Sequence, residues 1–365
     1  MISPITYGTA LLLTIVSMVC WGSWANTFKL SGKWRFELFY FDYAAGVLIA
    51  AVIAAFTLGS IGSELTFTDN LLVAGRTKMA WGLAAGVVFN LANMLLVAAI
   101  SIAGMAVAFP IGIGLALVVG VVWNYFLNPQ GNPTFLGAGV ALVVLAIIFD
   151  AMAYAKHARA KRLRTAAAAT PPSAADLAAA LKNRSKTPKR KAPVQNTSLK
   201  GIVISLVSGV LMGSFYPMVE MGKTEETGLG PYAIAFFFAI GVFLSTFVFN
   251  LYFMNLPVVG EPVGFGEYLK GSFKQHTLGL AGGLIWCTGA IANFVAASAP
   301  KEIHLGPAIS YAMGQGATLI SALWGLLVWR EFAGAGPRVR VLLALMLVLF
   351  VGGLTLVSVA PRYVP

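Results

Sequence analysis

Residues 16–24 read Val16-Ser17-Met18-Val19-Cys20-Trp21-Gly22-Ser23-Trp24 and lie inside a hydrophobic run near the N-terminus. Parts of this stretch return 191 residues later as Val207-Ser208 and Gly213-Ser214-Phe215. The register then continues through three further pairs of motifs: Ala44-x-Gly46-Val47 with Ala239-x-Gly241-Val242, Gly82-Leu83-Ala84-x-Gly86 with Gly279-Leu280-Ala281-x-Gly283, and Gly112-x-Gly114 with Gly314-x-Gly316. The two halves of the chain are therefore predicted to be copies of one unit.

Each copy contains five hydrophobic runs of about 20 residues, the length that a helix needs to cross a bilayer. The runs are continuous rather than alternating, which favours helices over a β-barrel. Because five is odd, the two copies must cross the membrane in opposite directions. The sequence predicts an all-α integral membrane protein with ten transmembrane helices in two inverted five-helix repeats, at residues 8–30, 37–59, 79–102, 104–126, 134–156, 200–222, 231–254, 277–299, 303–329 and 338–360.

The composition agrees with a membrane protein. Hydrophobic residues make up 58% of the chain and charged residues 10%, whereas soluble domains carry about a quarter charged residues. The formal charge of +12 is concentrated in loops, so we do not expect nucleic-acid binding. Cys20 and Cys287 lie in apolar runs of different halves and are expected to be buried thiols rather than a disulfide or a metal site. No cleavable signal peptide is evident.

The distribution of Lys and Arg predicts the orientation. Most of them follow the first, third, fifth, seventh and ninth spans, which the positive-inside rule places in the cytoplasm. We therefore predict both termini outside and the long central loop inside, in a plasma membrane or a bacterial inner membrane. The predicted organisation is a first repeat at 1–156, a basic linker at 157–199 and a second repeat at 200–365.

The linker is rich in Ala, Pro, Lys and Arg and contains no aromatic residue, which predicts mostly disordered chain. One interpretation is a basic tether held near anionic lipid headgroups. The other is a regulatory or partner-binding segment.

Polar and aromatic residues within the spans are candidate site residues, because polar groups are costly inside a bilayer. They are Trp24, Asn26, Asn90, Asn93, Tyr216, Trp286, Asn293, Tyr311 and Gln315. Amides offer paired donors and acceptors, and aromatic rings offer flat stacking faces. The set suits a neutral solute that is planar or polyhydroxylated: a nucleobase, a ureide or a sugar. The alternative for each residue is a role in helix packing.

The inverted repeat itself is an architecture of secondary transporters, in which the substrate site lies at the repeat interface. We expect a central cavity between helices 1–4 and 6–9, with helices 5 and 10 at the periphery. Pro110 and Pro217 are predicted to break or kink their helices near that cavity and to free backbone carbonyls.

Four charged residues lie within spans or at their ends. Lys29 and Asp42 are predicted to pair and close an inner gate, and Glu220, the repeat counterpart of Lys29, is the first candidate for proton coupling, with Asp42 second. Asp150 is expected to neutralise nearby Lys156. Structural ion pairing is the alternative for each.

Neither an enzyme nor a resident cofactor is indicated. Gly222-Lys223-Thr224 looks like the end of a phosphate-binding loop, but Pro217 stands where the first glycine is required and no strand precedes it. The histidine, cysteine and acidic residues have no metal-ligand spacing, and no nucleophile–base arrangement is visible. The expected coupling ion is the proton.

Three stretches resemble the ten-helix members of the drug/metabolite transporter superfamily, and among them the plant ureide permeases and their bacterial relatives. These are Trp21-Gly22-Ser23-Trp24, the segment from Phe41-Asp42-Tyr43 to Ile61-Gly62, and Trp324-Gly325-Leu326-Leu327-Val328-Trp329-Arg330-Glu331-Phe332. The resemblance implies proton-coupled uptake of allantoin, uracil, xanthine and related oxo-heterocycles. The family association of the central loop with a phosphate-binding motif finds no match in residues 157–199.

Two alternatives stay open. The broader group includes rhamnose and glucose transporters, so a sugar is one. The other is a membrane sensor or scaffold that acts through the basic loop and transports nothing. Small residues such as Gly352-Gly353 would permit a homodimer as well as a monomer.

Overall fold

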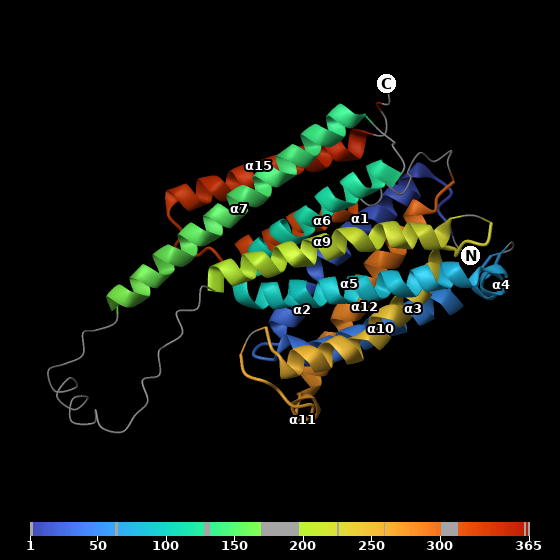
Figure 1. Ribbon diagram of the computed structural model, residues 1–365, viewed down its shortest axis with the longest axis horizontal. Helices are drawn as coiled ribbons and strands as arrows, with labels where there is room; N and C mark the ends of the chain where they lie inside the picture. The colour runs from blue at the N-terminus through green and yellow to red at the C-terminus, as the bar shows by residue number, and fades with distance from the viewer. Residues whose placement is uncertain are drawn as a thin grey trace.

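The computed structural model describes residues 3–62, 65–127, 132–168, 197–224, 226–258, 260–300, 313–360 and 363. Within these ranges the regular structure is helical, as predicted (Figure 1). The helices are α1 (Tyr7–Ser23), α2 (Ala25–Leu30), α3 (Phe36–Phe56), α4 (Phe67–Val73), α5 (Arg76–Ala103), α6 (Met105–Leu127), α7 (Pro133–Ala168), α9 (Thr197–Lys223), α10 (Pro231–Asn255), α11 (Gly266–Leu269), α12 (Phe273–Ala297), α14 (Ala317–Leu323), the π-helix η2 (Trp324–Val328) and α15 (Pro337–Val359).

Nine spans within the described residues are long and apolar enough to cross a membrane. They correspond to nine of the ten predicted spans. The remaining prediction, 303–329, lies partly outside the described residues, and its described part, Met313–Val328, is a shorter apolar helix.

The helices differ from the prediction in three details. The first span is interrupted at Trp24, where α1 gives way to α2. Helix α7 continues to Ala168, so the first part of the predicted linker is helical. The short helices α4 and α11 were not predicted, because neither is long enough to give a periodic hydrophobic pattern.

The predicted helix breaks at Pro110 and Pro217 do not occur, because α6 and α9 continue through them. Proline lacks an N–H group, so the carbonyls of Ala106 and Gly213, four residues earlier, still lose a helical partner. Neighbouring helices pack against both elements, and such packing lets membrane helices tolerate an internal proline.

The helix packing fits the inverted repeat. The contact of α5 with α9 has its counterpart in that of α12 with α1, and the contact of α3 with α12 has its counterpart in that of α10 with α5. A Cβ atom at Gly46 would collide with the Leu280 carbonyl oxygen, and a Cβ at the equivalent Gly241 would collide with that of Leu83. Repeat-related glycines thus permit equivalent close approaches in the two halves.

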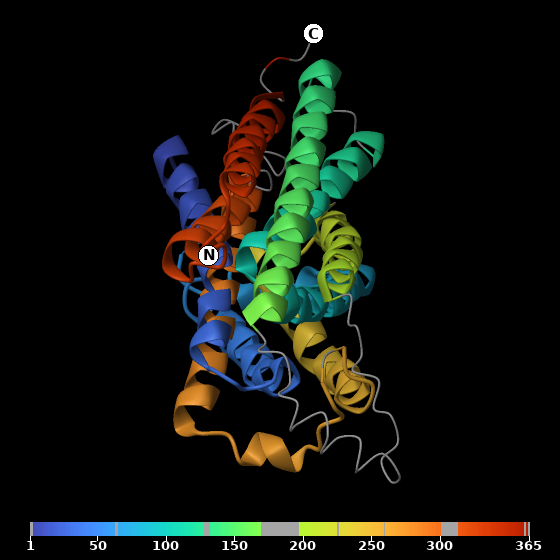
Figure 2. The same ribbon diagram turned by 90° about the vertical axis from the view of Figure 1, so that its left-hand side faces the viewer.

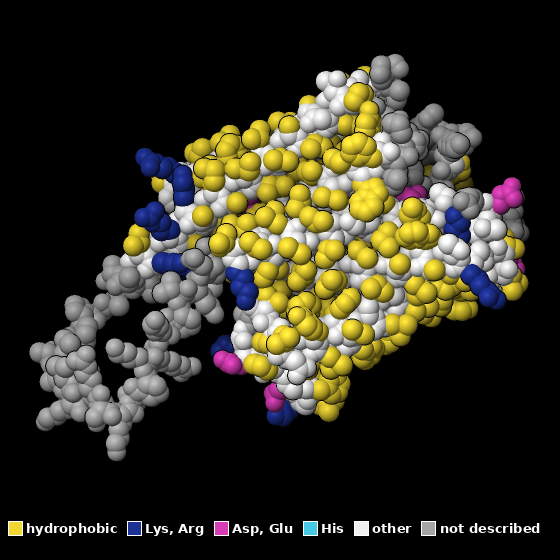
Figure 3. Space-filling view, viewed as in Figure 1, with side chains coloured by type: hydrophobic (Ala, Val, Ile, Leu, Met, Phe, Trp, Pro, Cys, Tyr) yellow, Lys and Arg dark blue, Asp and Glu magenta, His cyan; other side chains and the backbone are white. Residues whose placement is uncertain are grey.

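Helices α7 and α15 lie side by side at the edge of the bundle in both views, as expected for helices 5 and 10 (Figures 1 and 2). We call the end where α7 finishes and α9 begins the linker end. The chain termini lie at the opposite end (Figure 1). On the face shown in Figure 3, Lys and Arg side chains lie at the two ends, with several groups of them at the linker end, and hydrophobic side chains are spread over the surface between the ends.

Candidate substrate cavity

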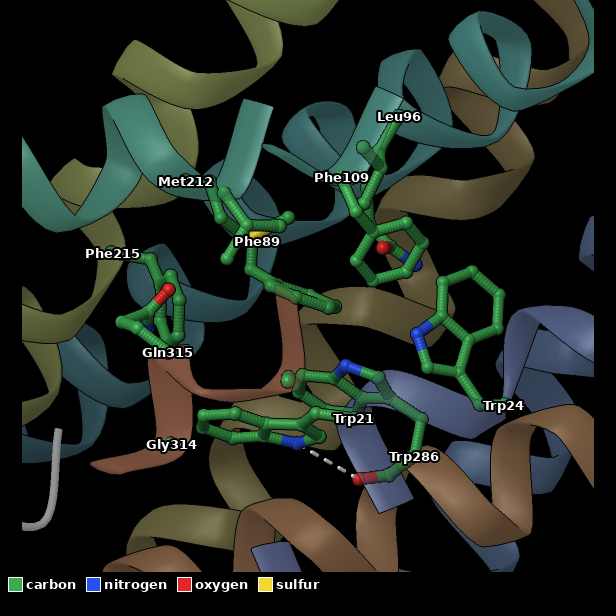
Figure 4. A pocket seen from close by; sticks show the side chains of 13 residues that line it. Trp21, Trp24, Phe89, Leu96, Phe109, Met212, Phe215, Trp286, Gly314 and Gln315 are labelled. Atoms are coloured by element: carbon green, nitrogen blue, oxygen red, sulfur yellow. Dashed lines mark hydrogen bonds between the residues drawn. The ribbon is translucent and has the colours of Figure 1, made fainter. Parts of the chain in front are cut away.

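A cavity lies inside the bundle where the two halves meet. We call it the aromatic cavity (Figure 4). Its lining comes from α1, α5, α6, α9, α12, α14 and the residues before α14, and consists of Trp21, Trp24, Phe89, Asn93, Leu96, Phe109, Ile113, Met212, Phe215, Trp286, Gly314, Gln315 and Ala317. None of these lining residues carries a charge. Its free volume is about 30 Å³.

The aromatic walls contain repeat-related rings. Phe89 and Trp286 occupy equivalent positions in the two halves and pack with their ring centroids 4.2 Å apart, at 33°. Trp21 stacks on Trp286 at 5.9 Å and 15°, and its indole N–H donates to the Trp286 carbonyl oxygen at 3.2 Å (Figure 4). Trp24 and Phe215 form another equivalent pair. The repeat therefore supplies flat surfaces from both halves.

Two amide side chains bring polar groups to these walls. The Asn93 side-chain amide donates to the hydroxyl oxygens of Tyr40 and Tyr43, each at 3.1 Å. The Tyr43 ring in turn packs against Trp24 at 4.9 Å. The Gln315 amide oxygen is buried and has no hydrogen-bond partner among the described residues. Gln315 thus holds an acceptor free at the cavity wall.

This arrangement suits a flat, uncharged molecule, which could stack on the rings while its edge meets the amides. The present volume holds little more than a water molecule, whereas pockets for small molecules measure roughly 300–1,000 Å³. At this volume the rings must separate before a heterocycle can enter, and we call this arrangement of the rings closed.

The structure brings Trp24, Asn93, Trp286 and Gln315 of the predicted set together in the cavity. Asn90 is placed between α5 and α10, where its amide donates to Ser245 at 2.8 Å and to Thr246 at 3.1 Å. Tyr311 lies outside the described residues.

The other predicted polar residues make contacts outside the cavity lining. The Tyr216 hydroxyl donates to the Asn293 amide oxygen at 3.1 Å, a buried contact between α9 and α12. Asn26 accepts a 2.7 Å bond from the Trp329 indole and donates to the Ser23 carbonyl oxygen at 2.8 Å. These bonds join helices to one another.

The predicted pairing of Lys29 with Asp42 is wrong. Lys29 points from α2 toward the connection between η2 and α15 and forms an ion pair with Glu331. The Glu331 carboxylate also accepts the backbone N–H groups of Met105 at 2.9 Å and Ala106 at 2.8 Å. Glu331 therefore caps α6, where the helix dipole favours a negative charge.

Asp42 is instead bonded to α11 and α12 at the linker end. One carboxylate oxygen accepts the Tyr268 hydroxyl at 2.7 Å, and the other lies 2.8 Å from Nδ1 of His276. Burial, followed by the bond to Asp42, raises the pKa of the Tyr268 hydroxyl, so this hydroxyl keeps its proton and remains a donor. Trp34 stacks on Tyr268 with ring centroids 6.3 Å apart.

The other two acidic candidates differ from each other. Glu220 pairs with Lys223, one turn later on α9, at 3.1 Å and is partly exposed. Asp150 is fully buried, and neither of its oxygens has a hydrogen-bond partner among the described residues. The expected neutralisation of Asp150 by Lys156 is therefore not seen.

Sequence reasoning missed several lining residues. Phe89 and Phe109 carry no polar atom and look like ordinary membrane-helix residues. The internal repeat could have identified Phe89 as a lining residue, because its repeat counterpart Trp286 was already a candidate. Glu331 was missed as a cap because its partners are far away in the sequence.

A sequence profile of the family described as Ureide permease matches residues 39–198 and 186–360, which together cover most of the chain. The chain belongs to the ureide permease family. The members of this family are membrane transporters and not enzymes. Membership thus agrees with the apolar helices and with the resemblance of the three sequence motifs.

Individual relatives match over nearly their full length. The protein named Ureide permease 1 of Arabidopsis thaliana is 25% identical over 384 residues, covering 94% of this chain and 95% of the relative. Ureide permease 4 of the same plant is 25% identical over 396 residues, covering 94% of each. A solved structure described as "Crystal structure of protein" has a TM-score of 0.51 at 17% identity, covering 97% of this chain and 98% of the other, and shares the fold alone.

Proposed function

We propose that this family member transports a small, neutral, planar solute of the ureide or nucleobase class, such as allantoin, uracil or xanthine, across a plasma or bacterial inner membrane. The observation that carries the proposal is the aromatic cavity, where stacked rings from both repeats meet two amides and no charged lining residue. The names of the relatives favour this class over a sugar.

In this proposal the rings of Phe89, Trp286 and Trp24 sandwich the planar solute. The Asn93 and Gln315 amides bond to its edge, because ureides and oxo-heterocycles present alternating N–H and C=O groups that amides match. Gln315 contributes the acceptor that has no partner in the closed arrangement.

Transport would proceed by alternating access, with the two repeats rocking about the cavity. The Lys29–Glu331 pair joins α2 to the η2–α15 connection, and the Asp42–His276 pair joins α3 to α12. Opening the linker end would separate elements that these pairs hold together. The proton is the proposed coupling ion, and acidic residues within the spans, Glu220 and Asp42 among them, are the groups that could carry it.

The proposed orientation keeps both termini outside and the linker end in the cytoplasm. Lys161, Arg162 and Arg164 are exposed on the final turns of α7 at that end. We propose that these side chains contact anionic lipid headgroups, which attract basic segments next to a membrane.

The test is uptake of radiolabelled allantoin, uracil, xanthine and rhamnose by the purified full chain in proteoliposomes. We expect uptake of at least one oxo-heterocycle, and its loss in Gln315→Ala and Asn93→Ala. Asn255→Ala is the control, because Asn255 is exposed and, among the described residues, its side chain bonds to the Leu251 carbonyl oxygen of its own helix. Uptake of rhamnose alone, or undiminished uptake in both cavity variants, would refute the proposal.

A further inference from the structure

Asp150 lies on the face of α7 that is turned into the bundle. Four residues later, the Tyr154 hydroxyl lies 3.5 Å from the Ile102 carbonyl oxygen near the end of α5. One turn further on, the His157 ring lies 5.1 Å from the ring of Phe332. This face of α7 therefore packs against the end of α5 and the connection between η2 and α15.

A second carboxylate, Glu331, lies at the same junction: it directly precedes Phe332, and a Cβ atom at Gly104, two residues beyond Ile102, would lie 2.6 Å from a Glu331 carboxylate oxygen. Glu331 is already bonded to Lys29 and to the first two N–H groups of α6. Besides Glu331 and Lys29, the titratable groups described near this face are Tyr154 and His157 on α7 itself. An ionised Asp150 would be buried without a donor beside a negative charge, whereas the protonated acid is far less costly to bury.

Asp42 and Glu220, the two candidates for proton coupling that the sequence offered, differ from Asp150 in their partners. Asp42 receives hydrogen bonds from Tyr268 and His276, and Glu220 pairs with Lys223. Each of these carboxyl groups thus has a hydrogen-bond or ionic partner. Asp150 has no such partner among the described residues, so the closed arrangement favours a proton on it.

A row of unpartnered oxygens leads from the aromatic cavity toward this site. The side-chain oxygens of Gln315, Thr318 and Ser321 are buried and have no hydrogen-bond partner among the described residues. Residues three apart share a helix face. Gly325, four residues beyond Ser321, continues that face, and a Cβ atom there would lie 2.8 Å from a Glu331 carboxylate oxygen. The row therefore starts at the cavity wall and ends at the Glu331 carboxylate.

We propose that Asp150 is the proton-carrying carboxyl group of this transporter, and that the Gln315, Thr318 and Ser321 side chains form the path between it and the cavity. The inference rests on the proposed function, because it assigns the coupling site of that transport. The Thr318 and Ser321 hydroxyl groups can both donate and accept hydrogen bonds, and water molecules between the three side chains would complete the path.

Separation of the Lys29–Glu331 ion pair would allow Asp150 to release its proton. While Lys29 is bonded to Glu331, Asp150 keeps its proton as a neutral acid. When the linker end opens, the Lys29–Glu331 pair separates and Asp150 releases its proton toward the linker end. The freed Lys29 ammonium group then offsets the negative charge of the Asp150 carboxylate that remains. Closing restores the Lys29–Glu331 pair, and Asp150 takes up another proton through the path from the cavity.

The test compares two transport modes in proteoliposomes containing the full chain, with labelled allantoin and uracil as probes. One is accumulation driven by an imposed pH gradient, and the other is exchange of labelled for unlabelled solute without a gradient. Asp150→Asn keeps the volume of the side chain but cannot release a proton. We expect gradient-driven accumulation to fall at least tenfold and exchange to stay within twofold of wild type. Glu267→Gln, an exposed change in α11, should alter neither mode.

A second measurement does not depend on transport. The infrared carbonyl band of a protonated carboxyl group should be present in the wild-type protein at neutral pH and absent from Asp150→Asn. Undiminished gradient-driven accumulation in that variant, loss of exchange in folded variant protein, or an unchanged infrared band would each overturn the inference. If wild type exchanges neither solute, the proposed function fails, and the infrared band alone then decides whether Asp150 holds a proton.

Discussion

The aromatic cavity and the linker end differ in how far they follow the internal repeat. The cavity is built from repeat-related positions, with Phe89 opposite Trp286 and Trp24 equivalent to Phe215. The charged groups of the linker end have no such symmetry. The repeat counterpart of Lys29 is Glu220 at the opposite end, and that of Asp42 is Phe237.

This difference separates two tasks. Duplication of the five-helix unit produces a cavity whose walls come from both halves. Because the Lys29–Glu331 and Asp42–His276 pairs have no repeat-related equivalents among the described residues at the other end, opening the linker end would differ in energy from opening the other end. We infer that the symmetric part of the molecule determines what is bound, and the asymmetric part determines how closing is coupled to charge.

The largest expected effect tests the symmetry of the scaffold. Gly46→Ala and Gly241→Ala each place a Cβ atom against a backbone carbonyl of a packed helix. Overpacking of this kind costs up to about 3 kcal/mol, so both variants should lose several degrees of melting temperature, and by similar amounts. Gly137→Ala is the control, because a Cβ at Gly137 meets no atom within 4 Å. A large loss in one variant alone would break the equivalence of the halves.

The second-largest effect is expected at the linker end. Glu331→Gln leaves Lys29 without its ionic partner and weakens the cap of α6. We expect about 2 kcal/mol of destabilisation, between the loss of a charged hydrogen bond and that of a buried ion pair, measured as thermal stability in detergent. Lys29→Met in the same background should restore part of the loss. An unchanged melting temperature in Glu331→Gln would show that the pair does not hold this end.

A smaller effect is expected in the cavity. Trp286→Ala removes the ring that contacts Phe89, Trp21 and Phe238. Loss of aromatic stacking on a base costs about 1–3 kcal/mol, so affinity for uracil should fall by roughly 5- to 150-fold. Trp286→Phe should retain most of it. Equal affinity in all three proteins would place the solute elsewhere.

The smallest effect concerns one hydrogen bond. Tyr43→Phe removes one of the two acceptors of the Asn93 amide and leaves the other, at Tyr40. A net loss of about 1 kcal/mol would weaken solute binding roughly fivefold, measured by competition with labelled uracil. A loss as large as that of Asn93→Ala would mean that Tyr43 itself contacts the solute.

The sequence was sufficient for the helices and for part of the cavity. Continuous apolar runs and repeated glycine motifs predict the spans, because membrane helices need a fixed length and close packing needs small residues. Four of the predicted site residues, Trp24, Asn93, Trp286 and Gln315, lie together in the aromatic cavity.

Other features depend on how each helix is rotated about its axis and on which distant segments it meets, and the spacing of residues in the sequence does not determine either. Asn90 and Asn93 are three residues apart, yet one contacts α10 and the other lines the cavity. Lys29 has Asp42 nearby in sequence but pairs with Glu331, because α2 packs its charged side toward the start of α6. The sequence around Asp150 suggested Lys156 as its partner and could not show which residues of other helices lie near it.

The most direct test of the central claim is the thermal stability of the detergent-purified chain in the presence of allantoin, uracil, xanthine, uric acid, glucose and rhamnose. A ligand that binds the folded state raises the melting temperature by mass action. We predict a rise with one or more of the oxo-heterocycles, none with the sugars, and loss of the rise in Trp286→Ala. A rise with the sugars alone, or an equal rise in wild type and Trp286→Ala, would contradict the assignment of the aromatic cavity as the site for a planar heterocycle.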